Sequence, residues 1–483
     1  MRSIYKLAAL LPASLMLLAG CAKIDEDIQF VRLEETTYSF QYKDNEPQTV
    51  VIEASGQWQA EASVSWIEIV EQTAGGAVIN VQDNIDATEM RGGKIIITCG
   101  QASETVYVYQ LGNTYNEWTY RYPIQFDLGA VVSPNGRYIA GRIPELQEDN
   151  SYISRVIFID TETGEWHEVA EIPNSLFAIE KPYAVTDQGQ AFFLNTKGND
   201  CVIIDLEGNI TKVQAPEEYK YGGHVQCVSA DGRLWGGYVS RPRSEGIQYM
   251  PALWTDGVAE VLPIPELNYH NQPHSTGILL RGMSHDGSVL YGSTWDNNDF
   301  GMVYWKKDAS GKYQVDYVAR DRIEEFETEV NGKLITRVEV DGMTVQAQCT
   351  NISPNGKYIA GIYREEHGDV GNWVKYPGFL NTETGEVTTF PTHDGGGVTA
   401  TDDGIGFITN GTVMPTSGAV VDIDNGVMLG SVEDWVYENY GIHVSFGYIT
   451  YVCPNGTLKA QSKDLGPIAR TVTWIVSPSP KEN

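Results

Sequence analysis

Residues 133–141 read Ser-Pro-Asn-Gly-Arg-Tyr-Ile-Ala-Gly, and residues 353–361 repeat this stretch as Ser-Pro-Asn-Gly-Lys-Tyr-Ile-Ala-Gly. The first four residues predict a hairpin turn, because Pro fixes φ at the first corner, Asn caps the turn and Gly accepts positive φ. The next residues predict the strand that leaves the turn. The closing Ala-Gly permits another strand to pack closely against it.

Five shorter copies of the turn are spread over the same half of the chain. They start at Thr186, Ser229, Ser284, Thr401 and Cys453. The seven starts are separated by 53, 43, 55, 69, 48 and 52 residues. A period of this size predicts an array of structural repeats.

A second hairpin signal alternates with the first. Between successive turn motifs the sequence has an apolar strand, a Gly-containing turn and another strand, as in 155–160 followed by Thr163-Gly164. Each unit therefore predicts a four-stranded antiparallel sheet, and seven such sheets arranged radially form a β-propeller. Residues 113–483 resemble bacterial propellers built from Ser-Pro-Asp-Gly repeats, which implies this fold and no particular activity.

Two irregularities in the repeat carry further predictions. The last unit is one strand short, so we expect the strand-like segment 115–124 to complete it and join the two ends of the ring. The 69-residue interval contains an extra hairpin at 324–345, with turns at Asn331-Gly332 and Asp341-Gly342, which we expect to project from the ring.

Residues 34–112 predict a smaller domain. Seven short alternating runs separated by turn residues are typical of an immunoglobulin-like β-sandwich. These runs are 37–42, 49–54, 58–62, 66–70, 77–81, 94–98 and 105–110. The predicted fold class is thus all-β, with an Ig-like sandwich followed by a seven-bladed propeller.

The sandwich segment resembles the BACON domain of Bacteroidetes surface proteins. The resemblance rests on Gly56-Gln57-Trp58, Ser65-Trp66-Ile67, Asn84, Arg91-Gly92, the strand 94–98 and the closing run 106–112. It implies either carbohydrate binding or a plain spacer role. Trp58 and Trp66 can stack on sugar rings, but their alternating neighbours favour positions in the sandwich core.

The first residues indicate export and lipid anchoring. Arg2 and Lys6 precede a short apolar run, and Leu17-Leu18-Ala19-Gly20 before Cys21 resembles a bacterial lipobox. We predict a signal peptide at 1–20, an acylated Cys21 and an acidic tether at 21–33. The resemblance of Lys23–Asp27 to a Bacteroidetes export signal implies an outer-membrane lipoprotein at the cell surface. An ordinary secretory signal stays open as the alternative.

Charge and cysteine content limit the partners. The chain has 64 acidic and 33 basic residues and a formal charge of −31, which becomes −33 when Arg2 and Lys6 are removed with the signal. This acidic excess argues against nucleic acid as a partner. The expected partners are the outer membrane through the lipid anchor, a glycan, and other outer-membrane proteins. Five cysteines follow Cys21 at wide spacing, which predicts buried thiols and leaves a single disulfide open.

The propeller resemblance implies ligand binding at one mouth of a central channel. If the strand before each turn is innermost, the residues three and five positions before the turn share one face. The polar ones are Lys181, Tyr183, His224, Gln226, Arg281, Gln348, Thr350, Tyr448 and Thr450, and the others are Leu128, Ala130, Leu279, Gly396 and Val398. This ring predicts a site for a hydroxylated or anionic ligand. A water-filled channel lined by ordinary polar groups stays open.

Catalytic and metal signals are weak. The sequence has no G-x-S-x-G, H-E-x-x-H, Walker or dinucleotide motif. Glu365 and Glu366 can supply paired carboxylates for acid–base work or belong to a solvated loop. His270 and His274 lie in a predicted loop, and the acidic run 296–299 predicts a turn better than a Ca²⁺ site. We therefore expect no metal and no cofactor.

Three functions remain, from different classes. We favour non-enzymatic binding of a glycan or another extracellular ligand at the channel mouth, because no pair of carboxylates stands out among 64 acidic residues. The alternatives are a glycosidase or lyase on the same propeller and a scaffold that docks other outer-membrane proteins.

Overall fold

The structure is a computed structural model of the 483-residue chain. It describes residues 29–34, 37–85, 91–112, 115–124, 130–148, 152–173, 179–197, 200–219, 221–243, 246–295, 300–330, 332–345, 351–366, 373–391, 393, 395–411, 417–440, 447–464 and 470–480. The predicted signal peptide, Cys21 and the acidic export signal lie outside these residues. No helix in the described ranges is long and apolar enough to span a membrane.

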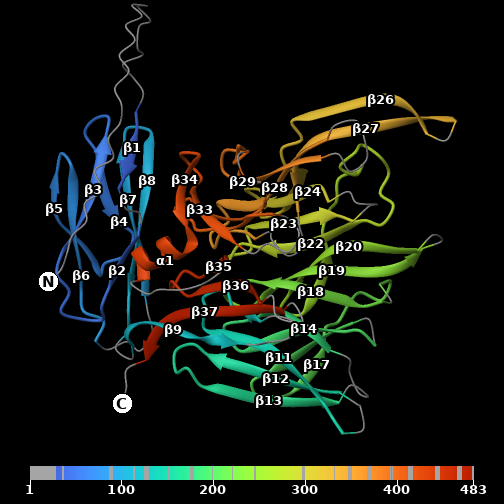
Figure 1. The fold of residues 1–483 in the computed structure, drawn as a ribbon, viewed down its shortest axis with the longest axis horizontal. Helices are drawn as coiled ribbons and strands as arrows, with labels where there is room; N and C mark the ends of the chain where they lie inside the picture. The colour runs from blue at the N-terminus through green and yellow to red at the C-terminus, as the bar shows by residue number, and fades with distance from the viewer. Residues whose placement is uncertain are drawn as a thin grey trace, which may run out of the picture.

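The N-terminal domain is a sandwich of two four-stranded sheets (Figure 1). One sheet has the order β1 (Val31–Leu33), β3 (Gln48–Ala54), β6 (Gly76–Val81), β5 (Ile67–Thr73). The other has the order β2 (Thr37–Phe40), β8 (Ala102–Gln110), β7 (Arg91–Cys99), β4 (Gln59–Ala62). Alternate residues of both sheets fill one core, where Ile79 and Ile97 are fully buried.

Two details of the sandwich bear on the sequence predictions. Its first strand, β1, lies inside the segment predicted as a tether, because Val31 is buried in the core and Val31–Leu33 pair with β3. The tether prediction is therefore wrong at its C-terminal end. Trp58 is 8% exposed within the core and donates its indole N–H to the Ala74 carbonyl, while Trp66 packs at the core edge beneath Arg91.

Seven further sheets follow around a ring. The first sheet is β10 (Val131–Val132), β11 (Tyr138–Leu146), β12 (Tyr152–Asp160) and β13 (Trp166–Pro173). The second is β14 (Ile179–Val185), β15 (Gln190–Asn195), β16 (Asp200–Asp205) and β17 (Ile210–Lys212). The third is β18 (Gly223–Val228), β19 (Leu234–Arg243), β20 (Gly246–Thr255) and β21 (Val258–Val261). The fourth is β22 (Ile278–Met283), β23 (Val289–Thr294), β24 (Met302–Lys307) and β25 (Tyr313–Tyr317).

The remaining sheets complete the ring. The fifth is β26 (Arg322–Val330), β27 (Lys333–Thr344), β28 (Tyr358–Glu366), β29 (Trp373–Asn381) and β30 (Val387–Thr389). The sixth is β31 (Gly397–Ala400), β32 (Ile405–Thr409), β33 (Gly418–Asp422) and β34 (Val427–Ser431), and the seventh is β35 (Tyr448–Val452), β36 (Leu458–Asp464), β37 (Arg470–Pro480) and β9 (Tyr115–Ile124). The predicted all-β fold with seven propeller blades is confirmed.

The ring closes as the sequence predicted. β9 pairs antiparallel with β37, the last strand of the chain, and so becomes the outermost strand of the seventh blade. The two ends of the propeller are thereby hydrogen-bonded into one sheet.

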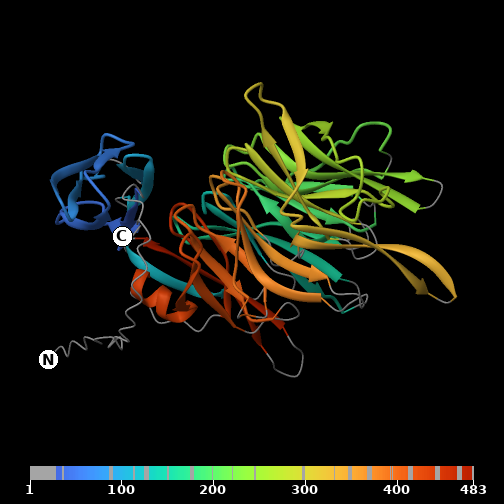
Figure 2. The ribbon, with the colours of Figure 1, turned by 90° about the horizontal axis from the view of Figure 1, so that it is seen from above.

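A long hairpin projects from the fifth blade (Figures 1 and 2). All of β26 pairs with residues 333–341 of β27, which confirms the predicted extra hairpin. The predicted turn at Asp341-Gly342 is wrong. Asp341 still pairs with Arg322 in the hairpin, whereas Gly342 pairs with Arg364 of the blade, so the strand changes partner here without reversing.

The repeated turn is held by a buried hydroxyl. Ser133 is fully buried; its N–H donates to the Tyr138 carbonyl (2.8 Å) and its hydroxyl accepts the Tyr138 N–H (2.9 Å). Gly136, at φ 83°, donates its N–H to the Ser133 carbonyl. The same bonds recur at Ser229, Ser284 and Ser353.

These turns share one face of the ring, which we name the turn face. Neighbouring turns are joined directly, since the N–H of Asn135 reaches Asp187 (3.2 Å) and the N–H of Asn355 reaches Asp402 (2.9 Å). The opposite face, here the loop face, carries the connections from one blade to the next. One of these contains α1 (Val432–Tyr440), whose apolar side buries Val432 and Val436 against the sixth and seventh blades.

The innermost strands carry a bulge at a constant position. The pairing register slips by one residue at the third position before the turn's Ser, Thr or Cys. The extra residues are Tyr183, Gln226, Arg281, Val398 and Thr450. Because a bulge redirects a side chain and breaks simple alternation, the face that these residues present is set by the bulge and not by a period of two.

Glycines of the second strands lie opposite this irregular backbone. A Cβ on Gly237 would overlap the His224 carbonyl oxygen, and one on Gly292 would overlap the carbonyl oxygen of Leu279. The closing Gly of the sequence motif is therefore required by the close approach of the innermost strand.

Replacing Gly237 with Ala should lower the free energy of unfolding by about 1–3 kcal/mol, because backbone must move to admit the methyl group. Thermal unfolding measures this change. Gly75→Ala in the sandwich is the matched control, since a Cβ there meets nothing within 4 Å. Equal melting temperatures for the two variants would contradict the close approach.

The sandwich meets the turn face of the propeller at an acidic contact. Glu104 of β8 is partly buried and lies near Asp403, Asp422 and Asp424, with Lys357 as the nearby cation. Burial first, and the charge of Asp424 second, raise the pKa of Glu104 to about 6. The ionised carboxylate thus weakens this contact.

Glu104→Gln should therefore stabilise the protein above pH 6 by up to about 1 kcal/mol after solvent screening. A raised folded-state pKa means that the wild type gains stability as the pH falls from about 6 toward the ordinary pKa of Glu, so the difference should vanish near pH 4. Melting temperatures of both proteins across this range measure it. A constant difference at every pH would show that charge is not the cause.

Candidate functional site

Side chains of the fourth and seventh blades meet at the turn face of the ring. His285, in the turn of the fourth blade, hydrogen-bonds through Nε2 to the hydroxyl of Tyr451 in the seventh blade (2.7 Å). Burial lowers the pKa of His285 to about 4, so the imidazole is neutral at pH 7. The amide of Asn351 also reaches the carbonyl of Thr450 (3.5 Å). The fourth and seventh blades are therefore joined at the turn face.

Aromatic and basic side chains of the second and third blades lie close together on the innermost strands and the strands that follow them. Lys181 lies over the ring of Tyr183 at 5.7 Å. His224 is 6% exposed and stacks on Tyr238, with ring centroids 4.7 Å apart and planes 8° apart. Tyr249 contacts Tyr238 edge-on at 5.6 Å. The result is a wall of rings with polar edges, the kind of surface on which sugars stack.

Arg281 of the fourth blade joins this cluster. It is the bulged residue of β22 and lies near Tyr183, Tyr238 and Tyr291. Its guanidinium lies over the ring of Trp295 at 5.2 Å, and Trp295 is 39% exposed. Burial lowers the pKa of Arg281 and raises that of Tyr238, so the cluster holds two cations, Lys181 and Arg281, beside neutral phenols.

Lys459 adds a third cation, from the seventh blade. It is on β36 opposite Tyr451 and is mostly buried. Burial first, and the charge of Lys181 second, lower its pKa to about 8. Lysines from the second and seventh blades therefore approach one another across the channel.

The other predicted positions fall into three groups. Tyr448 is 5% exposed and donates to Gln461 (2.9 Å), and Thr450 donates to the Lys459 carbonyl (3.1 Å), so both are committed within their own blade. Gln226 is partly exposed on its bulge. Leu128, Gln348 and Thr350 lie outside the described residues.

The apolar positions of the predicted ring lie inside the protein. Ala130, Leu279 and Val398 are buried, with 4% or less exposed, and Gly396 is buried as well. The polar surface of the channel is therefore concentrated in the second, third, fourth and seventh blades.

Glu366 is a structural anchor at the base of the projecting hairpin. It is 7% exposed; its carboxylate contacts His270 (3.1 Å) and Arg364 (2.7 Å) and accepts the Val340 N–H (3.0 Å). These charges and hydrogen bonds hold its pKa below the ordinary value despite burial. All of its acceptor capacity is used, so it has none left for acid–base work.

Glu365 lies beside the hydroxyl of Tyr376 at 3.5 Å and is partly exposed. His274 contacts the Pro265 carbonyl while His270 contacts Glu366, so the two histidines do not converge. Within the described ranges no group of three His, Cys, Asp or Glu side chains is arranged to hold a metal ion. The acidic run 296–299 lies outside those ranges.

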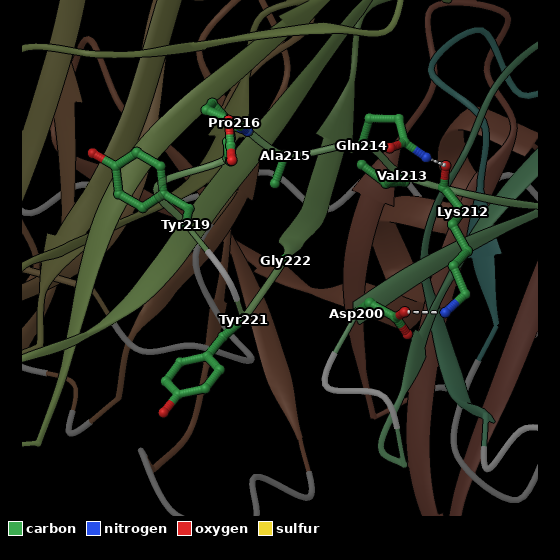
Figure 3. Close-up of a pocket in the computed structure, with 10 residues that line it drawn as sticks. Asp200, Lys212, Val213, Gln214, Ala215, Pro216, Tyr219, Tyr221 and Gly222 are labelled. Carbon is green, nitrogen blue, oxygen red and sulfur yellow. Dashed lines mark hydrogen bonds and ion pairs between the residues drawn. The ribbon is translucent and has the colours of Figure 1, made fainter.

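A second depression lies between the second and third blades (Figure 3). It has a volume of about 300 Å³, and its two tyrosines, Tyr219 and Tyr221, lie on the opposite side from the Asp200–Lys212 ion pair (2.7 Å). Its charged side chains are Asp200, Lys212 and Glu217, so acidic groups outnumber basic ones there.

Sequence reasoning missed residues that lie on second strands. Tyr291 and Lys459 belong to β23 and β36. A rule that counts only innermost positions cannot find them. The signal that was available for Tyr291 is the aromatic residue that follows the turn in Val289-Leu290-Tyr291.

Comparisons with known proteins match parts of this picture. The BACON family model, described as "Putative binding domain, N-terminal", matches residues 56–111, which confirms the resemblance predicted for this segment. No functionally curated protein matches the chain.

Several solved structures are similar in overall shape. A protein of unknown function from Bacteroides thetaiotaomicron is 10% identical, with 92% of this chain and 98% of that one covered and a TM-score of 0.37. An auxiliary nutrient binding protein from the same species is 11% identical, with 93% and 98% covered and a TM-score of 0.35. The β-propeller domain of the Trilobed protease from Pyrococcus furiosus is 11% identical, with 81% and 96% covered and a TM-score of 0.36. Likeness at this level carries no inference about ligand or activity.

Replacing Lys459 with Met should stabilise the protein at pH 7 by about 1–2 kcal/mol, because the buried ammonium is held near another cation. The folded-state pKa is below the unfolded one, so wild-type stability should rise between pH 8 and about 10.5 and the gain from the substitution should disappear there. Melting temperatures at pH 7 and 10 measure this. Lys333→Met, at an exposed hairpin position, should change neither value; a similar gain there would contradict the cause.

Proposed function

We propose that this chain is a lipid-anchored surface protein that binds a hydroxylated, glycan-type ligand at the loop-face mouth of its propeller channel. The observation that carries the proposal is the cluster of His224, Tyr238, Arg281 and Trp295, which presents aromatic faces and hydrogen-bond donors together. Sugar recognition uses this combination, because the apolar face of a sugar ring stacks on an aromatic ring while its hydroxyls need polar partners.

The contact between blades at the turn face supports entry from the opposite side. The His285–Tyr451 hydrogen bond joins the fourth and seventh blades at that end, so we expect a ligand from the loop face to reach a floor rather than an open tunnel. A site with walls and a floor buries more ligand surface than a flat face does.

The N-terminal region supports display. The lipobox resemblance at Leu17–Cys21 implies an acylated Cys21, and the sandwich lies between that residue and the propeller in the sequence. The match of residues 56–111 to a family described as a binding domain is compatible with a contribution of the sandwich to capture.

Screening the purified protein against a glycan array, followed by calorimetry on the hits, tests the proposal. Trp295→Ala should weaken binding about 5- to 30-fold, the loss expected for one stacking platform. Trp166→Ala is the matched control, because Trp166 is 54% exposed on β13, the outermost strand of the first blade.

Equal affinity in wild type and Trp295→Ala would contradict a site at this mouth. Release of shortened or unsaturated sugars from a bound glycan would instead favour the enzymatic alternative. Glu365→Ala would then test whether that carboxylate takes part.

A further inference from the structure

The channel concentrates positive charge in a strongly acidic protein. The whole chain has a formal charge of −31, yet three cations from different blades lie near one another: Lys459 is close to Lys181, and Lys181 and Arg281 are both close to Tyr183. Like charges brought together inside a protein destabilise it unless an anion offsets them. Folding stability alone therefore does not account for the arrangement of these three cations.

Of these three cations, Arg281 is the one whose surroundings the structure describes in most detail. It is on the bulge of β22, mostly buried among Tyr183, Tyr238 and Tyr291. Its Nε is buried and has no hydrogen-bond partner, and no described carboxylate forms an ion pair with its guanidinium. A buried guanidinium normally has an anionic partner, because desolvating its charge is costly.

Lys459 is in a similar position. Its neighbours in charge are Lys181, which repels it, and the thiol of Cys453. No carboxylate among the described residues is paired with its ammonium. An anion placed beside Lys459 would lower the free energy of its buried ammonium.

The carboxylates of Asp187 and Asp402 already accept hydrogen bonds from the backbone of neighbouring turns. Asp187 and Asp402 lie near Tyr451 toward the turn face, where they accept the backbone N–H groups of Asn135 and Asn355. They hold neighbouring turns together and therefore do not offset the three cations.

We propose that the channel selects ligands that carry an anionic group, a carboxylate or a sulfate, on a hydroxylated framework. The inference rests on the proposed function, since it assigns the charge of the ligand at that same site. Arg281 donates through its guanidinium to the anion, Lys459 and Lys181 offset its charge, and the aromatic wall of Tyr238 and Trp295 contacts the remainder of the ligand.

Calorimetry with matched monosaccharides tests the selection: glucose, glucuronate and glucose 6-sulfate. We expect the wild type to bind at least one of the two anionic sugars at least 10-fold more tightly than glucose, with an affinity that falls as NaCl rises from 50 to 300 mM. Glucuronate and glucose 6-sulfate distinguish the carboxylate from the sulfate as the recognised group.

Arg281→Gln should reduce the affinity for the preferred anionic sugar about 10-fold or more and change that for glucose less than twofold. Arg281→Lys, which keeps the charge, should recover part of the loss and guards against a misfolded variant. Arg233→Gln removes an exposed cation that pairs with Asp256 on the turn face (2.7 Å) and should leave all affinities unchanged.

Failure of this inference is separable from failure of the proposed function. Equal affinity for glucose and both anionic sugars, lost in Trp295→Ala but not in Arg281→Gln, would overturn the charge selection and leave glycan binding in place. If no glycan of the array and none of the three sugars binds the wild type, both proposals are wrong.

Discussion

The close approach of the second strand to a bulged innermost strand is the contact on which the blades depend. Gly237 and Gly292 lie against carbonyl oxygens of the bulged strand, where any side chain would overlap backbone. Because the bulge falls at the same distance from each turn, it turns the residue at that position in every blade that has one. The residues that can face a ligand, Arg281 among them, are therefore set by backbone geometry before any ligand is considered.

Much of this architecture could be predicted from the sequence, because each propeller blade contains a recognisable turn motif. Residues 133–136 and their six copies mark where each innermost strand ends, and a missing strand at the end of the chain identifies β9 as the closing strand. The bulge could not be predicted, since the innermost strands are too short for the shift in alternation caused by one inserted residue to be recognised. The turn predicted at Asp341-Gly342 was wrong because these residue types favour turns, but here the strand β27 continues and only its partner strand changes from β26 to β28.

The candidate site was harder to predict than the fold. The innermost positions predicted Lys181, Arg281 and His224 as site residues, but the rule missed Lys459 because it belongs to a second strand whose register only the structure shows. The helix α1 was also missed, although its start has a sequence signal. Ser431 accepts the Asp434 N–H (3.1 Å) and donates to its carboxylate (2.8 Å), an N-cap that a search for Ser followed three residues later by an acidic residue would find.

The closing strand has a mechanical consequence. β9 begins three residues after Gly112 at the end of the sandwich segment, and its pairing with β37 is the seam that holds the ring shut. A pull applied to the N-terminal side passes through the sandwich and reaches this seam before any other blade. The seventh blade, which also carries Lys459, is therefore the first part of the propeller to bear the load, and one antiparallel strand pair resists it.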